Sequence, residues 1–97
     1  MSEFNVVLAP RAENDIAEAF GWYLERNATA ADAFRAEVFE TIDRLAEAPL
    51  SWPADDDGNR KRVVKRFPYS EWFEVLGSTV TVLAVAHHKR RPAYGRK

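Results

Sequence analysis

The hydrophobic period of this chain changes once, and that change limits the folds open to it. Between residues 11 and 48, apolar side chains such as Ile16, Phe34 and Val38 recur every three or four positions. From Arg60 onward, apolar and polar residues alternate instead. The first period is typical of helices buried along one face, and the second is typical of strands. We therefore predict an α+β fold in which helices precede most of a sheet.

The helical region divides into two helices that should form an antiparallel hairpin. Pro10 suits a first helical turn, because its missing N–H would lack a partner there anyway. The residues "NATA" break the pattern, and Thr29 followed by Asp32 predicts the start of the second helix, although an acid is an unusual capping-box partner. Pro49 should end that helix near Ala48. A short break of this kind places two helices side by side.

One strand is predicted before the helices and three after them. The β-branched stretch 3–9 predicts the first strand. Gly77 and Ser78 form a two-residue hairpin turn, so the later strands should build an antiparallel meander. These strands are expected at residues 60–67, 69–76 and 79–87. The last is the most apolar and should be central. The order is β-α-α-β-β-β, a helical hairpin packed on a small antiparallel sheet.

Composition limits the class of protein further. The chain has 97 residues, of which 46% are apolar, which is enough for one core in a single domain spanning 1–97. It has no cysteine, which excludes disulfides and thiol chemistry. Its longest apolar run, "VLAVA", is far shorter than the roughly 20 residues that span a bilayer. We expect a soluble, cytoplasmic protein with no membrane partner.

The net charge of −1 conceals two oppositely charged halves. Residues 1–57 carry 13 acidic and four basic side chains, whereas residues 58–97 carry ten basic and two acidic ones. Such asymmetry favours two faces with different electrostatic partners. A basic sheet could meet nucleic acid or an acidic protein segment. Acidic helices and a basic sheet could equally well only complement each other.

The residue pattern indicates neither a cofactor nor a metal site. His87 and His88 are the only histidines, and adjacent strand residues point to opposite faces, so the pair cannot chelate one ion. The acidic cluster before Gly58 lacks the alternating spacing and the distal glutamate of a calcium loop. No serine lies in the context of an activated nucleophile. One histidine could still serve as a general acid or base.

The basic residues are the most informative candidates for a binding site. Arg60, Arg62 and Arg66 share one face of a predicted strand, and Lys89, Arg90 and Arg91 begin the C-terminal tail. Arginine forms bidentate contacts with phosphate or carboxylate groups. Aromatic residues lie among these cations. That combination suits stacking on bases as well as a protein interface.

Glu71 is an exception within its own strand. It falls on the face shared by Tyr69, Phe73 and Val75, which is the better core face. A buried, unpaired carboxylate there would be costly. Glu71 should therefore either pair with a nearby cation or lie at a sheet position open to water.

The chain resembles the RelE/ParE superfamily, the toxins of type II toxin–antitoxin systems. The resemblance covers nearly the whole chain and rests on "LAPRAENDIAEAFGWYLER", "RLAEAP", "RKRVVKRFPYSEWFEV" and "VTVLAVAHHKRRP". The "RFPY" segment and the final strand are more similar to the ParE branch. Relatives of that branch generally carry an apolar residue where Glu71 stands. The resemblance implies a helical hairpin on a small antiparallel sheet joined by the N-terminal strand.

The resemblance also implies two alternative activities. ParE-like members inhibit DNA gyrase without known chemistry of their own, whereas RelE-like members cut mRNA in the ribosome. The ribonucleases have an arginine where this chain has Ser70 and another where it has His88. Tyr94 matches a tyrosine of their site, and His88, Tyr94 and Arg62 would form the alternative catalytic set. Because that set is incomplete, the residues favour a non-enzymatic gyrase inhibitor.

A cognate antitoxin is the implied partner, and a toxin–antitoxin hetero-oligomer is the implied assembly. The antitoxin would supply an acidic, amphipathic segment that fills grooves beside the helical hairpin and the sheet. Its acids would meet the arginines and lysines named above. Four residues left out of the predicted core are candidates for the apolar contacts to antitoxin or target: Trp22, Leu24, Phe39 and Trp52.

Overall fold

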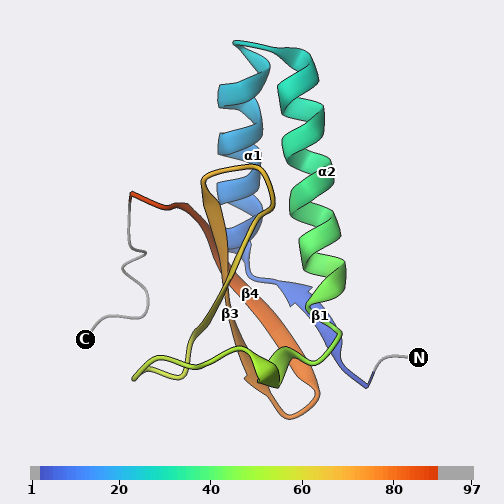
Figure 1. Ribbon diagram of the computed structural model, residues 1–97, viewed down its shortest axis with the longest axis vertical. Helices are drawn as coiled ribbons and strands as arrows, with labels where there is room; N and C mark the ends of the chain where they lie inside the picture. Colours follow the sequence, from blue (N-terminus) through green and yellow to red (C-terminus); the bar gives the residue numbers. More distant parts are fainter. Residues whose placement is uncertain (1–2, 90–97) are drawn as a thin grey trace.

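The computed structural model describes residues 3–89, in which two helices lie on one face of a four-stranded sheet (Figure 1). The elements follow the predicted order, with one short 3-10 helix added between the helices and the later strands. The bounds are β1 Asn5–Leu8, α1 Pro10–Leu24, α2 Ala28–Arg44, the 3-10 helix Pro49–Ser51, β2 Arg60–Val63, β3 Tyr69–Leu76 and β4 Thr79–His87.

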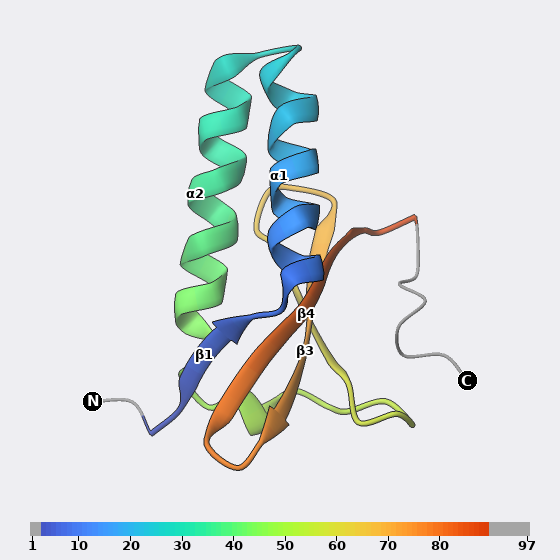
Figure 2. The ribbon, with the colours of Figure 1, turned by 180° about the vertical axis from the view of Figure 1, so that it is seen from behind.

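The sheet has the order β1-β4-β3-β2, so β3 and β4 are its inner strands. β2, β3 and β4 form the predicted antiparallel meander, and β4 is central as its apolar sequence indicated. The expectation of a wholly antiparallel sheet is wrong, because β1 runs parallel to β4. Parallel neighbours need a long connection, which the helices, β2 and β3 provide here. The opposite view shows β1 beside β4 (Figure 2).

The two helices form the predicted hairpin, but the second begins earlier than its sequence suggested. Asn27, not Thr29, caps α2: its side-chain oxygen accepts a hydrogen bond from the Ala30 N–H at 3.1 Å. Asparagine is among the best capping residues, because it satisfies a backbone donor that the helix leaves free. At the other end α2 stops at Arg44, and Ala48 takes a left-handed conformation before Pro49.

The first strand of the meander is shorter than the alternating sequence predicted. β2 ends at Val63, and the following residues turn. Arg66 has a φ of 71°, a left-handed conformation that a strand does not contain. Arg66 therefore does not share a strand face with Arg60 and Arg62, which corrects the expected cluster of arginines.

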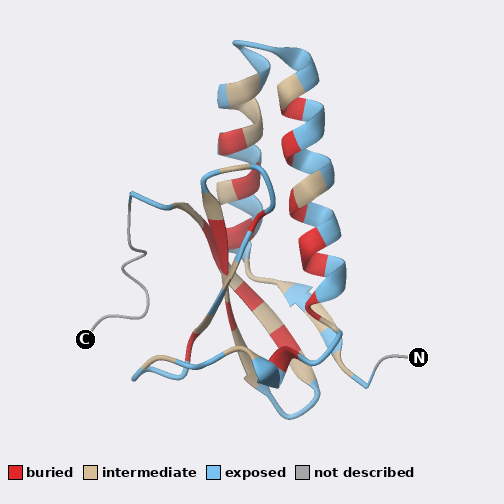
Figure 3. Ribbon diagram, viewed as in Figure 1, coloured by how far each residue is buried: buried red, intermediate tan, exposed pale blue. Residues whose placement is uncertain are grey.

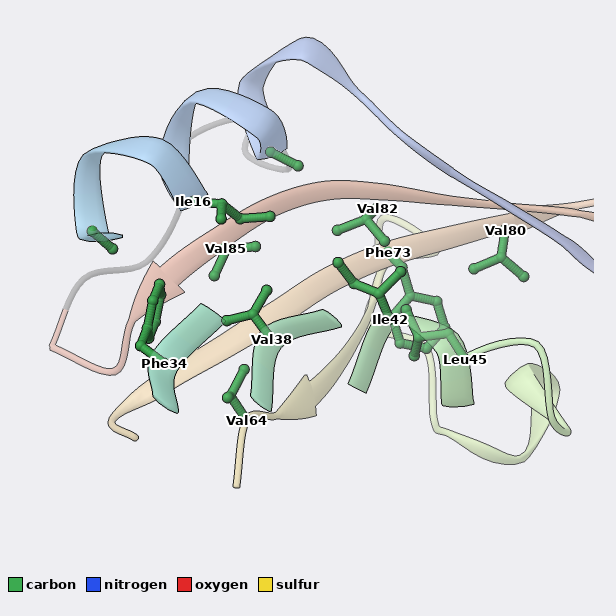
Figure 4. Close-up of a cluster of buried hydrophobic side chains, with 12 residues drawn as sticks. Ile16, Phe34, Val38, Ile42, Leu45, Val64, Phe73, Val80, Val82 and Val85 are labelled. Carbon is green, nitrogen blue, oxygen red and sulfur yellow. The ribbon is translucent and has the colours of Figure 1, made fainter. Parts of the chain in front are cut away.

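The core is the layer between the helices and the sheet, where the buried residues of both are concentrated (Figure 3). Figure 4 shows how α2 and α1 contribute side chains that meet those of β3 and β4. Phe34 and Phe73 are fully buried in it. Phe34 also lies within 5.5 Å, between ring centroids, of Tyr23, Phe67 and Tyr69. The remaining members of the buried cluster are Ala12, Ile16, Ala19, Val38, Ile42, Leu45, Val64, Val80, Val82 and Val85.

Asp15 ties α1 to the end of β4. The Val85 N–H donates a hydrogen bond of 3.0 Å to the Asp15 carboxylate. β1 pairs with β4 only as far as Val82, so Val85 has no strand neighbour on that side. Asp15 satisfies a donor that would otherwise be left at the sheet edge. No helix in residues 3–89 is both long and apolar enough to cross a membrane.

We expect Asn27→Ala to lower the free energy of unfolding by about 1 kcal/mol, because it removes the cap of α2. In a domain of this size that loss lowers Tm by roughly 4–8 °C. Thermal unfolding followed by circular dichroism measures it. Thr29→Ala is the matched control and should leave Tm almost unchanged. A larger loss in Thr29→Ala than in Asn27→Ala would show that the capping residue is Thr29 after all.

Candidate functional site

Two grooves flank the helical hairpin where it meets the sheet. The first has a volume of about 580 Å³ and lies between α2 and the edge strand β2. Its floor and walls mix small apolar groups with charged ones, and cations come from both sides. The lining residues are Ala36, Glu37, Glu40, Thr41, Arg44, Arg62, Val63, Lys65 and Arg66.

The second groove, of about 670 Å³, lies between α1 and the adjoining ends of β3 and β4. It is richer in aromatic groups. Trp22 and Tyr23 contribute from the helix, and Tyr69 and His87 contribute from the sheet. Partial burial raises the pKa of the Tyr23 phenol above its usual value. The other lining residues are Asp15, Glu18, Ala19, Pro68, Val85 and Lys89.

Arg60 and Arg62, both predicted site residues, are held against Trp52. The Arg60 Nε donates a hydrogen bond of 2.7 Å to the Trp52 carbonyl. The Arg62 guanidinium lies 5.0 Å from the centroid of the Trp52 ring, within cation–π distance. Trp52 itself is half-buried and packs against the core. The structure thus groups these three residues and gives each a contact within the chain.

The third predicted arginine of this region, Arg66, forms a salt bridge with Glu37 of α2. This pair joins the β2–β3 connection to the second helix across the first groove. Arg44 makes a second ion pair on the same helix, at 2.9 Å from Glu40. The Arg44–Glu40 pair is exposed on both sides, and such pairs contribute little to stability. In the other pair Arg66 is exposed, whereas the Glu37 side chain is only 14% exposed.

The C-terminal candidates are only partly within the described residues. His87 ends β4, and its ring contacts Tyr69 edge-on at 5.2 Å between centroids. His88 lies in the turn after the strand, and its N–H donates to the Pro68 carbonyl. Lys89 is exposed and lines the second groove. Arg90, Arg91 and Tyr94 lie outside the described residues.

The predicted apolar contacts also differ in their surroundings. Trp22 and Leu24 are each 51% exposed at the end of α1, and Phe39 is 39% exposed on α2. These three are available to a partner. One face of the Trp22 ring is covered by the Arg26 guanidinium, 3.9 Å from the centroid.

Glu71 is neither paired nor open to water. Its residue is 0% exposed, and neither carboxyl oxygen has a hydrogen-bond partner among the described residues. In the sheet it lies between Arg62 of β2 and Val85 of β4. Burial raises the pKa of this carboxyl to about 9, and the opposing charge of Arg62 lowers that value only in part. Glu71 is therefore protonated and neutral at pH 7.

The neighbouring residue, Ser70, is also shielded from solvent. Ser70 is 2% exposed, and its hydroxyl has no partner among residues 3–89. Within that range no three residues of the His, Cys, Asp and Glu types gather where they could hold a metal ion. Arg62 and His88, two members of the alternative catalytic set, are separated by β3.

Some residues of the grooves were not predicted from sequence. Glu37, Arg44 and Lys65 line the first groove, and Asp15 and Tyr23 line the second. Glu37, Glu40 and Arg44 recur at helical spacing on the polar face of α2, which is a signal that they share one surface. Nothing in the sequence indicates that this surface faces β2, because that contact joins distant segments.

Comparison with known families decides the class of protein. A family model described as "ParE toxin of type II toxin-antitoxin system, parDE" matches residues 6–92. The chain belongs to the ParE toxin family. It is thus a ParE-type toxin of a type II toxin–antitoxin system, as its motifs indicated. A search among curated proteins gave no match.

A solved structure shares the fold of this ParE-family toxin. It is described as the chromosomal ParDE TA system from P. aeruginosa and superposes with a TM-score of 0.79. The match covers 88% of this chain and 96% of the other, at 18% sequence identity. At that identity the likeness concerns the fold alone, and it confirms the helical hairpin on a small sheet.

We predict that Glu71→Val raises Tm at pH 7, because it replaces a buried, unpartnered carboxyl with an apolar side chain. Differential scanning calorimetry measures the change. Glu74→Val, on the same strand but half-buried on the opposite face, is the control and should not produce the same gain. An unchanged or lower Tm for Glu71→Val would contradict a destabilising Glu71.

Stability should also depend on pH through Glu71. The pKa is about 9 in the folded chain and near 4.5 when unfolded, so between these values the folded state binds more protons. The free energy of unfolding therefore falls as pH rises, by about 1.4 kcal/mol per unit at most, and stops falling through this group above pH 9. Urea denaturation at several pH values measures the slope. Glu71→Gln should flatten it, and an equally steep slope in Glu71→Gln would rule Glu71 out as its source.

Proposed function

We propose that this toxin inhibits DNA gyrase and that a cognate antitoxin neutralises it by placing an acidic segment in the first groove. Membership of the ParE family carries the proposal of gyrase as target. The groove between α2 and β2 supports the mode of antitoxin binding. The proposed complex is a toxin–antitoxin hetero-oligomer, in which the toxin contributes positioned cations and the antitoxin contributes acids.

The first groove suits an acidic amphipathic segment on three grounds. Ala36, Thr41 and Val63 supply small apolar surface for its hydrophobic side. Arg62 and Lys65 face the same space and supply positive charge. β2 also lies at the edge of the sheet, with β3 as its only strand neighbour. Complementary charge of this kind determines partner choice and the rate of association.

Further cations and apolar groups would extend the contact beyond this groove. Arg60 and Trp52 continue the surface of Arg62. Lys89 and Trp22 line the second groove, which would receive apolar anchors of the antitoxin or of gyrase. We assign Arg66 to the same antitoxin surface, because its side chain is 75% exposed and lines the first groove. Arg90 and Arg91 complete the proposed set.

The alternative, a ribosome-dependent ribonuclease, is less well supported. In ribonuclease relatives an arginine follows the tyrosine that corresponds to Tyr69, and here that position is the buried Ser70. A second arginine of their site is replaced by His88. RNA cleavage needs cations at the phosphate and an acid and a base at the reacting oxygens. Those groups are not brought together among residues 3–89.

Two parallel assays test the target. Purified toxin is added to gyrase with supercoiled DNA and, separately, to translating ribosomes. Stabilised double-strand breaks in the first assay are the expected result. Site-specific cuts in mRNA would replace gyrase with the ribosome as target. Silence in both assays would contradict the proposed inhibition and leave antitoxin binding as the function to be tested.

The antitoxin surface is tested by removing charge from the first groove and, as a control, from the opposite face of β2. The double variant Arg62→Gln/Lys65→Gln should weaken antitoxin binding about tenfold or more, because charged hydrogen bonds contribute about 1.5–3 kcal/mol each. Lys61→Gln is the matched control. Its side chain lies on the opposite face, near the Trp72 ring, and its loss should change Kd little. Isothermal titration calorimetry gives both constants, and equal losses in both proteins would place the antitoxin elsewhere.

A further inference from the structure

Arg62 lies between two groups that each suit a guanidinium, and it contacts only one of them. Directly across the β2–β3 pair stands Glu71, whose carboxyl oxygens lack partners among the described residues. The Arg62 guanidinium is instead stacked near the Trp52 ring, at 5.0 Å from its centroid. Because Glu71 is neutral, placing the Arg62 guanidinium on Trp52 leaves no unpaired carboxylate in the core.

We propose that Arg62 is an arm with two positions, on Trp52 while Glu71 is protonated and on Glu71 once that carboxyl is ionised, so that Glu71 competes with an acidic partner for this arginine. The first half concerns the free chain alone. The second half rests on the proposed function, in which the antitoxin binds at the first groove. Taken together, the two halves mean that Glu71 and the acidic side chains of the antitoxin compete for the Arg62 guanidinium.

Ionising Glu71 in its buried position has a high free-energy cost. A carboxylate in an apolar layer is strongly destabilising unless a cation and hydrogen bonds reach it. The apolar groups of α2 that face the sheet, such as Phe34 and Val38, offer none. Arg62 is the neighbour whose charge acts on Glu71. A turn of one flexible side chain meets the requirement without moving the helices.

The other titratable groups around this layer already have contacts within the chain, including Arg60 of β2, which donates to the Trp52 carbonyl. On α1, Asp15 accepts from the Val85 N–H and pairs with Arg11. On α2, Glu37 is paired with Arg66. The titratable side chains of the aromatic cluster and of the end of β4 are Tyr23, Tyr69 and His87. His87 Nδ1 accepts from the Lys89 N–H, which leaves Arg62 as the cation placed to respond.

The surroundings of Arg62 allow the movement. β2 has four residues, and among the described residues its outer edge is bridged only at Arg60, by Ala54, so the backbone at Arg62 is paired with β3 alone. Trp52 is held separately through its carbonyl by Arg60. It therefore stays in place when Arg62 leaves, and its ring loses a cation from one face. A change in the environment of the Trp52 ring therefore reports the position of the Arg62 side chain.

Competition follows from linkage between the two sites. A carboxylate of the partner that holds Arg62 keeps it from Glu71, and Glu71 then retains its proton more strongly. Equally, ionised Glu71 reduces the availability of Arg62 to the partner. The two effects are equal in free energy, since binding and proton release are coupled through one side chain. Affinity for an acidic segment should therefore decline as pH rises.

The arm is tested on the free toxin by ¹⁹F NMR of chains labelled with fluorotryptophan. The chain has three tryptophans, so Trp22 and Trp72 serve as internal controls for Trp52. We expect the Trp52 resonance to shift with a single titration above neutral pH and the shift to be absent in Glu71→Gln. In Arg62→Met the resonance should stay at one position throughout. No shift in the unmodified chain, or the same shift in Glu71→Gln, would overturn the arm.

The competition is tested with a short oligoglutamate peptide as the acidic probe. Its Kd for the toxin should weaken by up to about tenfold per pH unit above the Glu71 titration and stay nearly constant for Glu71→Gln. Equal weakening in both proteins would overturn the competition. Failure of the peptide to bind either protein would overturn the docking half of the proposal, and the ¹⁹F titration would still decide the arm independently.

Discussion

One layer of side chains between the helical hairpin and the sheet holds this fold together. β1 and β2 are each four residues long, and α1 and α2 cover only one face of the sheet. Each of these elements therefore buries its apolar side chains in this one layer. Phe34 and Phe73 are both fully buried in this layer, and the aromatic residues around Phe34 extend it toward the hairpin loop. The carboxyl of Glu71 lies in the same layer, where a polar group is most expensive.

The burial of Glu71 connects stability with binding. The strand paired with it carries Arg60 and Arg62, two of the cations that we propose to meet an acidic partner. These arginines already have contacts with Trp52 inside the chain. Preorganised side chains lose less conformational freedom when a partner arrives, which favours affinity.

The sequence predicted those parts of the fold that depend on local pattern. β3 and β4 were predicted at their observed bounds, because long alternating runs flank a glycine turn. The cap of α2 was missed because the sequence analysis placed the helix start at Thr29, two residues after Asn27, whose side chain caps the helix in the structure. The parallel pairing of β1 with β4 and the left-handed turn at Arg66 were not predictable, since one joins distant segments and the other interrupts a regular pattern.

The features of the candidate site were likewise predicted where they depend on local pattern and missed where they depend on contacts between distant segments. Sequence predicted a basic strand and grooves beside the hairpin, and it placed Glu71 on the core face. It could not show that Arg66 bridges to Glu37, because the two residues are far apart in the chain. Nor could it show that the carboxyl of Glu71 lacks a partner, since a neighbouring strand places Arg62 directly opposite. Whether that arginine pairs with the acid or with Trp52 is a matter of side-chain geometry alone.

The buried carboxyl of Glu71 would make the stability of this toxin depend more strongly on binding of the proposed antitoxin. Any partner that binds only the folded chain adds to its stability by an amount that grows with the logarithm of its concentration relative to Kd. For a fold weakened by Glu71, that added stability is a larger share of the total than it would be with an apolar residue there. Because Arg62 serves both the carboxyl and the proposed docking groove, the same side chain would govern how stable the free toxin is and how strongly it binds an acidic partner.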